Sequence, residues 1–143
     1  MDASEAIARE QIRDVISRYN HAGDRGDLEA LVHCFTDSGV LDLDDEDDFA
    51  GRAAIHERLA RVVQGSVERG PRALVRHHVS SVKIELTSPD RARAASYFLV
   101  FTEVGLDHWG RYADQLERAG GEWRIAHRKV RVDGATPGSR MTR

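Results

Sequence analysis

The feature of this 143-residue sequence that most constrains its fold is a change of hydrophobic period near Gly70. Before this point, apolar residues recur every three or four positions, as they do along one side of a helix. After it, four long segments rich in Val, Ile, Tyr, Phe and Trp are separated only by short turns, as in consecutive antiparallel strands. Because the helices come first and the sheet follows, we predict an α+β fold in which helices cover one face of the sheet.

The first half contains three amphipathic stretches that predict helices. The first covers residues 8–22, and the second begins after Asp27, a suitable N-cap, and extends to Phe35. The third covers residues 52–64. Between the second and third, a short strand over residues 39–43 leads into the acidic run at 42–48, which lacks the ligand spacing of a calcium loop and therefore favours a solvated loop.

The second half predicts four strands, which cover residues 74–86, 91–103, 109–118 and 122–132. Glycine, proline and aspartate mark the turns between them. The tail at 133–143 has no apolar period, so we expect it to fray or to lie over a neighbouring segment. Because no internal repeat or linker interrupts the pattern, we predict one domain over residues 1–143, with a core at about 5–132.

Composition and charge exclude several classes of function. The 21 basic residues are scattered among 24 acidic ones and the net charge is -3, which argues against nucleic acid as a partner. No segment approaches the ~20 apolar residues that cross a bilayer, so we expect no membrane contact and a cytoplasmic location. The single cysteine, Cys34, lies on an apolar helical stripe, which favours a buried thiol, and no metal site is predicted.

Four short motifs occur in a characteristic order: AGDRGD at 22–27, RHHV at 76–79, GRY at 110–112 and EWRI at 122–125. Their order and spacing, over about residues 5–132, resemble the SnoaL-like branch of the nuclear transport factor 2 superfamily. The resemblance implies a cone-shaped fold, in which a strongly bent, antiparallel or mixed sheet wraps around helices and a deep cavity. It also implies a homodimer or homotrimer. Relatives include scytalone dehydratase, hexachlorocyclohexane dehydrochlorinase and the small subunits of ring-hydroxylating dioxygenases.

In the dehydratase and dehydrochlorinase relatives an Asp and a His form a catalytic dyad, and the resemblance places these roles on Asp24 and His77. An imidazole can take and return a proton near neutral pH, and a carboxylate fixes its tautomer and stabilises its cation. The resemblance therefore implies a lyase or isomerase without a cofactor, acting on a small hydrophobic molecule that is polyketide-, steroid- or aromatic-like. Two alternatives stay open: Asp24 as a turn residue with His77 as a sheet residue, or a non-catalytic binding or assembly domain.

The strand at 74–86 does not itself decide between His77 and His78. Val75, His77 and Val79 share one face under strict alternation, whereas Val82 and residues 84 and 86 have the opposite parity. A β-bulge between Val79 and Val82 would place both sets on one face, and such bulges occur where sheets bend and beside active sites.

Three further residues are candidates for substrate binding. Tyr19 lies on the apolar stripe of the first helix, and His127 is in phase with Trp123 on the last strand. Tyr97 on a middle strand is a third candidate. Each also fits a packing role in the core. Arg111 and Asp114 faintly match the Asp–Arg–Asp pattern of epoxide hydrolases. We rank epoxide hydrolysis below an elimination reaction carried out by the Asp24–His77 dyad.

Overall fold

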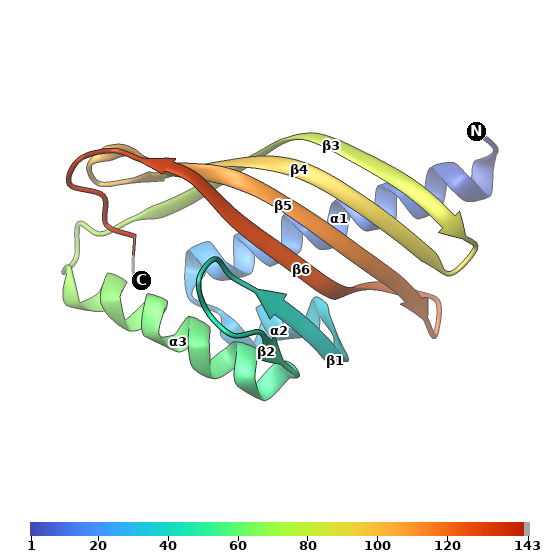
Figure 1. Cartoon of the computed structure of the whole chain (residues 1–143), viewed down its shortest axis with the longest axis horizontal. Helices are drawn as coiled ribbons and strands as arrows, with labels where there is room; N and C mark the ends of the chain where they lie inside the picture. The colour runs from blue at the N-terminus through green and yellow to red at the C-terminus, as the bar shows by residue number, and fades with distance from the viewer. Residues whose placement is uncertain (142–143) are drawn as a thin grey trace.

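The computed structural model describes residues 1–141, which form three helices and one six-stranded sheet (Figure 1). The elements are, in chain order, α1 (Ala3–Arg25), α2 (Leu28–His33), β1 (Phe35–Asp42), β2 (Phe49–Ala50), α3 (Arg52–Glu68), β3 (Val75–Ser88), β4 (Arg91–Thr102), β5 (Gly105–Ala119) and β6 (Glu122–Ala135). No helix among these residues is long and apolar enough to cross a membrane.

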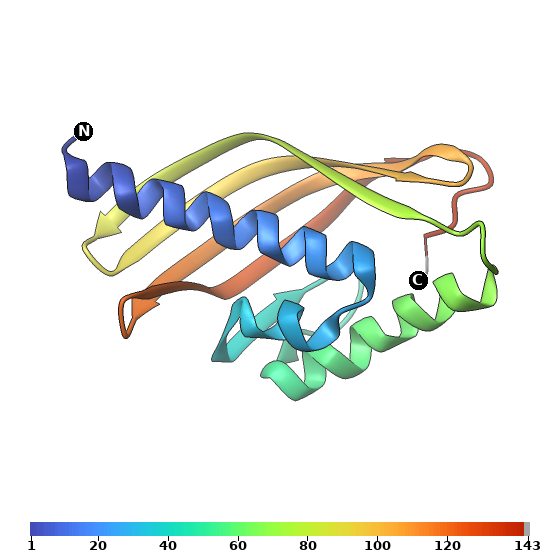
Figure 2. The ribbon, with the colours of Figure 1, turned by 180° about the vertical axis from the view of Figure 1, so that it is seen from behind.

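The sheet has the strand order β2-β1-β6-β5-β4-β3. Strands β3 to β6 form the predicted antiparallel meander, and β1 pairs with β6 in parallel. The sheet is bent, with α1 lying along its concave face and α3 beyond the end of α1 (Figures 1 and 2). The predicted α+β fold, with a curved mixed sheet around N-terminal helices, is therefore confirmed.

The turn between α1 and α2 follows from its capping residues. Gly26 adopts φ 72°, a left-handed conformation that suits glycine, and its N–H donates to the carbonyls of Ala22 and Gly23. Asp27 then caps α2 by accepting a hydrogen bond from the Ala30 N–H at 3.1 Å, as predicted. Helix α2 ends at His33, earlier than expected, because the chain turns there into β1.

The β-bulge that would place Val79 and Val82 on one face is present in β3. Between the pairs Ser80–Tyr97 and Lys83–Ala95, strand β3 contains one more residue than β4, and Ser81 has φ 52°. The extra residue reverses the alternation, so that Val79 and Val82 both pack against the same core.

The concave face of the sheet is filled differently at its two ends. At the closed end, the first half of α1 packs on the far ends of the strands, and Ile12, Ile84, Leu116 and Ile125 are at most 6% exposed. Full burial of such a side chain stabilises the fold by roughly 1.5–3 kcal/mol. At the open end, a smaller cluster of Phe98, Val100 and Tyr112 borders a cavity.

The C-terminal segment lies over a neighbouring turn, the second of the two outcomes expected for it. Strand β6 continues to Ala135, and the Thr136 hydroxyl then donates to the Leu106 carbonyl at 3.0 Å. The Ser139 hydroxyl and the Arg140 N–H both donate to the Asp107 carboxylate. Residues 142 and 143, the last two of the predicted tail, lie outside the described residues.

Candidate functional site

The open end of the fold encloses a cavity of about 600 Å³. Its walls are the end of α1, the inner side of α3 and the inward faces of β3 to β6. Leucine, valine and phenylalanine side chains make up much of the lining. Its polar lining includes Tyr19, Asp24, His77, Thr102, His108 and Tyr112.

Asp24 and His77 meet in this cavity although 53 positions separate them in the chain. His77 Nδ1 lies 2.5 Å from one carboxylate oxygen of Asp24, and the His77 backbone N–H donates to the other at 3.0 Å. The two side chains are 23% and 13% exposed. Because an ionised carboxylate only accepts hydrogen bonds, this geometry places the proton on Nδ1 and makes Nε2 the atom that can exchange a proton with a ligand.

The structure selects His77 over His78. His77 pairs with Val100, which is buried, whereas His78 pairs with Leu99 on the exposed face. The His78 ring contacts the ring of Phe101, with 5.2 Å between centroids. His78 is therefore outside the cavity.

Tyr19 and Tyr112 extend the polar side of the cavity. The Tyr112 hydroxyl donates to Asn20 Oδ1 at 3.2 Å, and its ring stacks on Phe98 at 4.7 Å and meets the ring of Tyr19 edge-on at 6.3 Å. Burial raises the pKa of both tyrosines, so their hydroxyls stay protonated and can only donate or accept hydrogen bonds. Tyr112 was not predicted as a site residue, although its even parity with Asp114 and Leu116 on β5 was a signal.

A buried ion pair supports these two rings. Arg128 and Asp114, both fully buried, are joined by two hydrogen bonds of 2.8 Å. The Arg128 guanidinium lies between the rings of Tyr19 and Tyr112, at 4.2 Å and 3.9 Å from their centroids. Burial opposes the charge of Arg128, but Asp114 outweighs it and the pKa of Arg128 is raised. Asp114 therefore pairs with Arg128, and the Arg111 of the epoxide-hydrolase pattern pairs instead with Asp133.

Tyr97 and His127 do not line the cavity, which corrects their predicted roles in substrate binding. The odd-numbered residues of β4 face outward, and Tyr97 is 59% exposed. On β6, Ile125 pairs with Leu116 and His127 with Gln115, so Ala126 is an extra residue. This bulge reverses the alternation, which turns Arg128 inward and His127 away from the face of Ile125.

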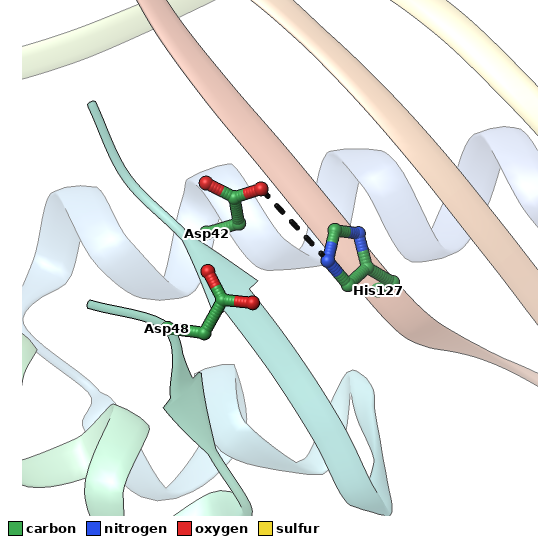
Figure 3. Close-up of side chains that lie close together, drawn as sticks. All are labelled: Asp42, Asp48 and His127. Atoms are coloured by element: carbon green, nitrogen blue, oxygen red, sulfur yellow. Dashed lines mark ion pairs between the residues drawn. The ribbon is translucent and has the colours of Figure 1, made fainter. Parts of the chain in front are cut away.

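His127 instead lies beside two aspartates of the acidic run (Figure 3). Its Nε2 is 3.9 Å from Asp42, and ligand atoms of Asp42, Asp48 and His127 all lie within 4.8 Å of one another. Arg131 already pairs with Asp42 at 2.9 Å, so a cation of the protein itself balances this cluster. Another part of the acidic run reaches the cavity, where Glu46 accepts hydrogen bonds from Arg58 that lower the pKa of Glu46.

Solved structures resemble this fold closely. A putative scytalone dehydratase from Novosphingobium aromaticivorans DSM 12444 is 19% identical with a TM-score of 0.82, over 95% of this chain and 91% of that one. A structure of LinA is 18% identical with a TM-score of 0.81, over 94% and 91% of the two chains. A Catenulispora acidiphila protein in complex with S-DNPA is 28% identical with a TM-score of 0.77, over 90% and 95%.

The comparison with curated proteins finds no match. The SnoaL-like domain family, in contrast, matches residues 4–129, which include both members of the Asp24–His77 pair. Because this match spans most of the sequence, the chain belongs to the SnoaL-like family.

Proposed function

We propose that this protein is a cofactor-independent lyase or isomerase that moves a proton on a small, largely apolar molecule. The observation that carries the proposal is the Asp24–His77 pair, with 2.5 Å between oxygen and Nδ1, inside the cavity. The volume of about 600 Å³ lies within the range of small-molecule sites, which suits a ligand of one to three rings. Membership of a family with dehydratase-type relatives supports the same class of reaction.

In this proposal His77 Nε2 removes a proton from a carbon next to a carbonyl group, and Asp24 stabilises the imidazolium that forms. In an isomerisation the electron pair of the C–H bond moves into an enolate, and the proton returns to another carbon. In an elimination the pair forms a C=C bond, the bond to the leaving group breaks, and that group receives the proton. Tyr19, which keeps its proton, can hold the ligand oxygen where negative charge develops.

The experiment uses 1-tetralone, a bicyclic ketone with exchangeable protons at C2, in D2O. NMR follows the replacement of these protons by deuterium in the presence of the protein. We expect the wild type to accelerate exchange and His77→Gln and Asp24→Asn to slow it by roughly a hundredfold to ten-thousandfold. His78→Gln, an identical change at the neighbouring histidine outside the cavity, is the matched control.

Exchange at the wild-type rate in both His77→Gln and Asp24→Asn would overturn the proposal. If the protein binds 1-tetralone but His77→Gln does not change the rate of exchange, the alternative function, a non-catalytic ligand-binding domain, is favoured. In either case circular dichroism should show that the variants keep the wild-type fold.

A further inference from the structure

One charged side chain is buried in the wall of this largely apolar cavity. Arg58 lies on α3 beside the lining residues Leu59 and Val62, and its side chain is only 5% exposed. It is the least exposed of the described arginines that line the cavity. A guanidinium stays charged in proteins, and a buried charge is costly unless a partner of opposite charge compensates it. Arg58 therefore needs an anion beside it.

The anion beside Arg58 is the carboxylate of Glu46, which belongs to the acidic run. Arg58 Nε donates to Glu46 Oε1 at 3.0 Å, and Arg58 Nη2 donates to Oε2 at 2.9 Å. Two N–H donors that meet two carboxylate oxygens form the geometry by which arginine recognises carboxylates in general. Glu46 also lines the cavity. The cavity wall therefore contains a complete carboxylate site, which a side chain of the protein itself fills.

The two partners of this pair differ in how firmly the fold holds them. Arg58 belongs to the helix α3, whereas Glu46 lies in the segment 43–48 between β1 and β2. Asp44 fixes the inner end of this segment by accepting a hydrogen bond from the Val132 N–H at 2.8 Å. The Glu46 side chain is 36% exposed, against 5% for Arg58. Glu46 can therefore turn into water while Arg58 stays in the wall, and Arg58 then needs another anion.

A ligand that carries a carboxylate can take the place that Glu46 leaves. The exchange replaces one carboxylate by another, so the charge beside Arg58 does not change. The ligand also brings its apolar part into contact with the cavity lining, and the burial of apolar area favours the exchange. A neutral ligand has no group that can replace Glu46 as the counter-ion of Arg58.

We propose that Arg58 is a carboxylate subsite of the cavity and that a carboxylate of the ligand replaces Glu46 on it. The ligand class is then a keto acid, an apolar molecule of one to three rings with a ketone for His77 and a carboxylate for Arg58. The ketone in this assignment rests on the proposed function, whereas the carboxylate rests on the Arg58–Glu46 pair alone. Glu46 acts as an internal competitor that keeps Arg58 oriented until the ligand binds.

The test compares 6-carboxy-1-tetralone with its methyl ester, which has the same rings and no negative charge. Titration calorimetry gives the Kd of each probe, and the ratio of the two values measures the preference for the acid. In Glu46→Gln the competing charge is removed, because an amide cannot compensate the charge of Arg58. We expect the preference of this variant for the acid to be about tenfold stronger than that of the wild type, as one charge-assisted pair allows.

Asp45→Asn is the matched control for Glu46→Gln. It removes the same charge from another residue that lines the cavity, but Asp45 is not the partner of Arg58. Because Asp45 is exposed, solvent and salt screen its charge, and the preference for the acid should change by less than about twofold.

Arg58→Gln shows whether the effect of Glu46→Gln passes through Arg58. In the Arg58→Gln background, the addition of Glu46→Gln should no longer raise the preference for the acid. Arg61→Gln removes the same charge from an exposed position on α3 and should leave the effect of Glu46→Gln intact. Thermal unfolding gives a second measurement, since 6-carboxy-1-tetralone should raise the Tm of Glu46→Gln more than its ester does. Neither this measurement nor the Asp45→Asn control requires the Arg58→Gln protein to fold.

The inference is wrong if Glu46→Gln and Asp45→Asn change the preference equally, or if Glu46→Gln still raises it in the Arg58→Gln background. None of these measurements needs proton transfer, which is read from the exchange of 1-tetralone and from His77→Gln. Proton exchange without an effect of Glu46→Gln on the preference refutes the role of Arg58 alone. A preference that follows Arg58 and Glu46, in a protein that exchanges no protons, refutes the role of His77 alone.

Discussion

The two ends of the concave face are built from the same four strands but are held together in different ways. At the closed end the inward positions are aliphatic. Ile12 on α1 and Ile125 on β6 are both fully buried in the same core. At the open end the inward positions include His77, Thr102 and His108, each with a hydrogen-bonding or aromatic partner. The open end is therefore organised by polar contacts around a space, and the closed end by apolar packing without one.

The two ends therefore differ in what holds their side chains in place. Apolar packing is non-directional and depends on area, whereas buried carboxylates must have their hydrogen bonds in place. Asp24 and Asp107 each accept a backbone N–H and a histidine Nδ1–H, one on each side of the cavity. We expect truncations at the closed end to act through lost apolar contact, and substitutions of the carboxylates at the open end to act through lost hydrogen bonds.

The largest effect on stability is expected from Ile125→Ala at the closed end. It would leave a dry cavity in a fully packed region and lower the free energy of unfolding by roughly 2–5 kcal/mol. Val100→Ala at the open end should cost less, because Val100 already borders the ligand cavity and its truncation only enlarges that space. Urea unfolding measures both. Equal losses for the two variants would contradict the distinction between the ends.

A smaller loss, with a pH dependence, is expected from Asp107→Asn. The amide replaces an acceptor by a donor in a fully buried site with four donors around it, which should cost about 2–3 kcal/mol near neutral pH. Because the pKa of Asp107 is lowered by folding, its charged form stabilises the protein above the usual aspartate pKa, and this contribution disappears as the pH falls below that value.

The difference between wild type and Asp107→Asn should therefore shrink on acidification. Urea unfolding at about pH 7 and about pH 3 brackets the usual aspartate pKa of about 3.9. Asp47→Asn, in the exposed acidic run, is the control and should change stability little at either pH. A difference that stays constant with pH would mean that the open end does not depend on the charge of Asp107.

The sequence predicted the closed end better than the open end, for a physical reason. Apolar residues carry the periodic signal, and the mismatch in parity between Val79 and Val82 indicated where a bulge would lie, which the structure has at Ser81. The bulge at Ala126 gave no such signal, because Arg128, the residue that it turns inward, is polar. Strict alternation therefore placed His127 inward. His108, which is in phase with Tyr112 on β5, was missed because the predicted strand began at residue 109.

The pair of Asp24 and His77 was predicted from the resemblance, and parity alone left His77 and His78 equal. The C-terminal segment was hard to predict because hydrogen bonds to Asp107, rather than an apolar stripe, hold it in place. Tyr97 is a different case, since an aromatic residue on a strand fits a cavity wall or an outer surface equally well. Only its odd parity on β4 distinguishes them.

A substitution on the outer face of β4 is expected to have the smallest effect on the stability of the protomer, because this face belongs to neither end of the concave face. Tyr97, Leu99 and Phe101 are consecutive outward positions that are 59%, 42% and 37% exposed. We propose that a second copy of the chain covers this apolar row, in agreement with the expected homo-oligomer.

Leu99→Glu should then shift the protein towards monomer in light scattering. The side chains of this row point away from the concave face, so protomer unfolding should change by less than about 0.5 kcal/mol and tetralone exchange should keep its rate. Wild-type protein that is already monomeric at micromolar concentration would refute the association, and a large loss of exchange in Leu99→Glu would show that the outer face and the cavity are coupled.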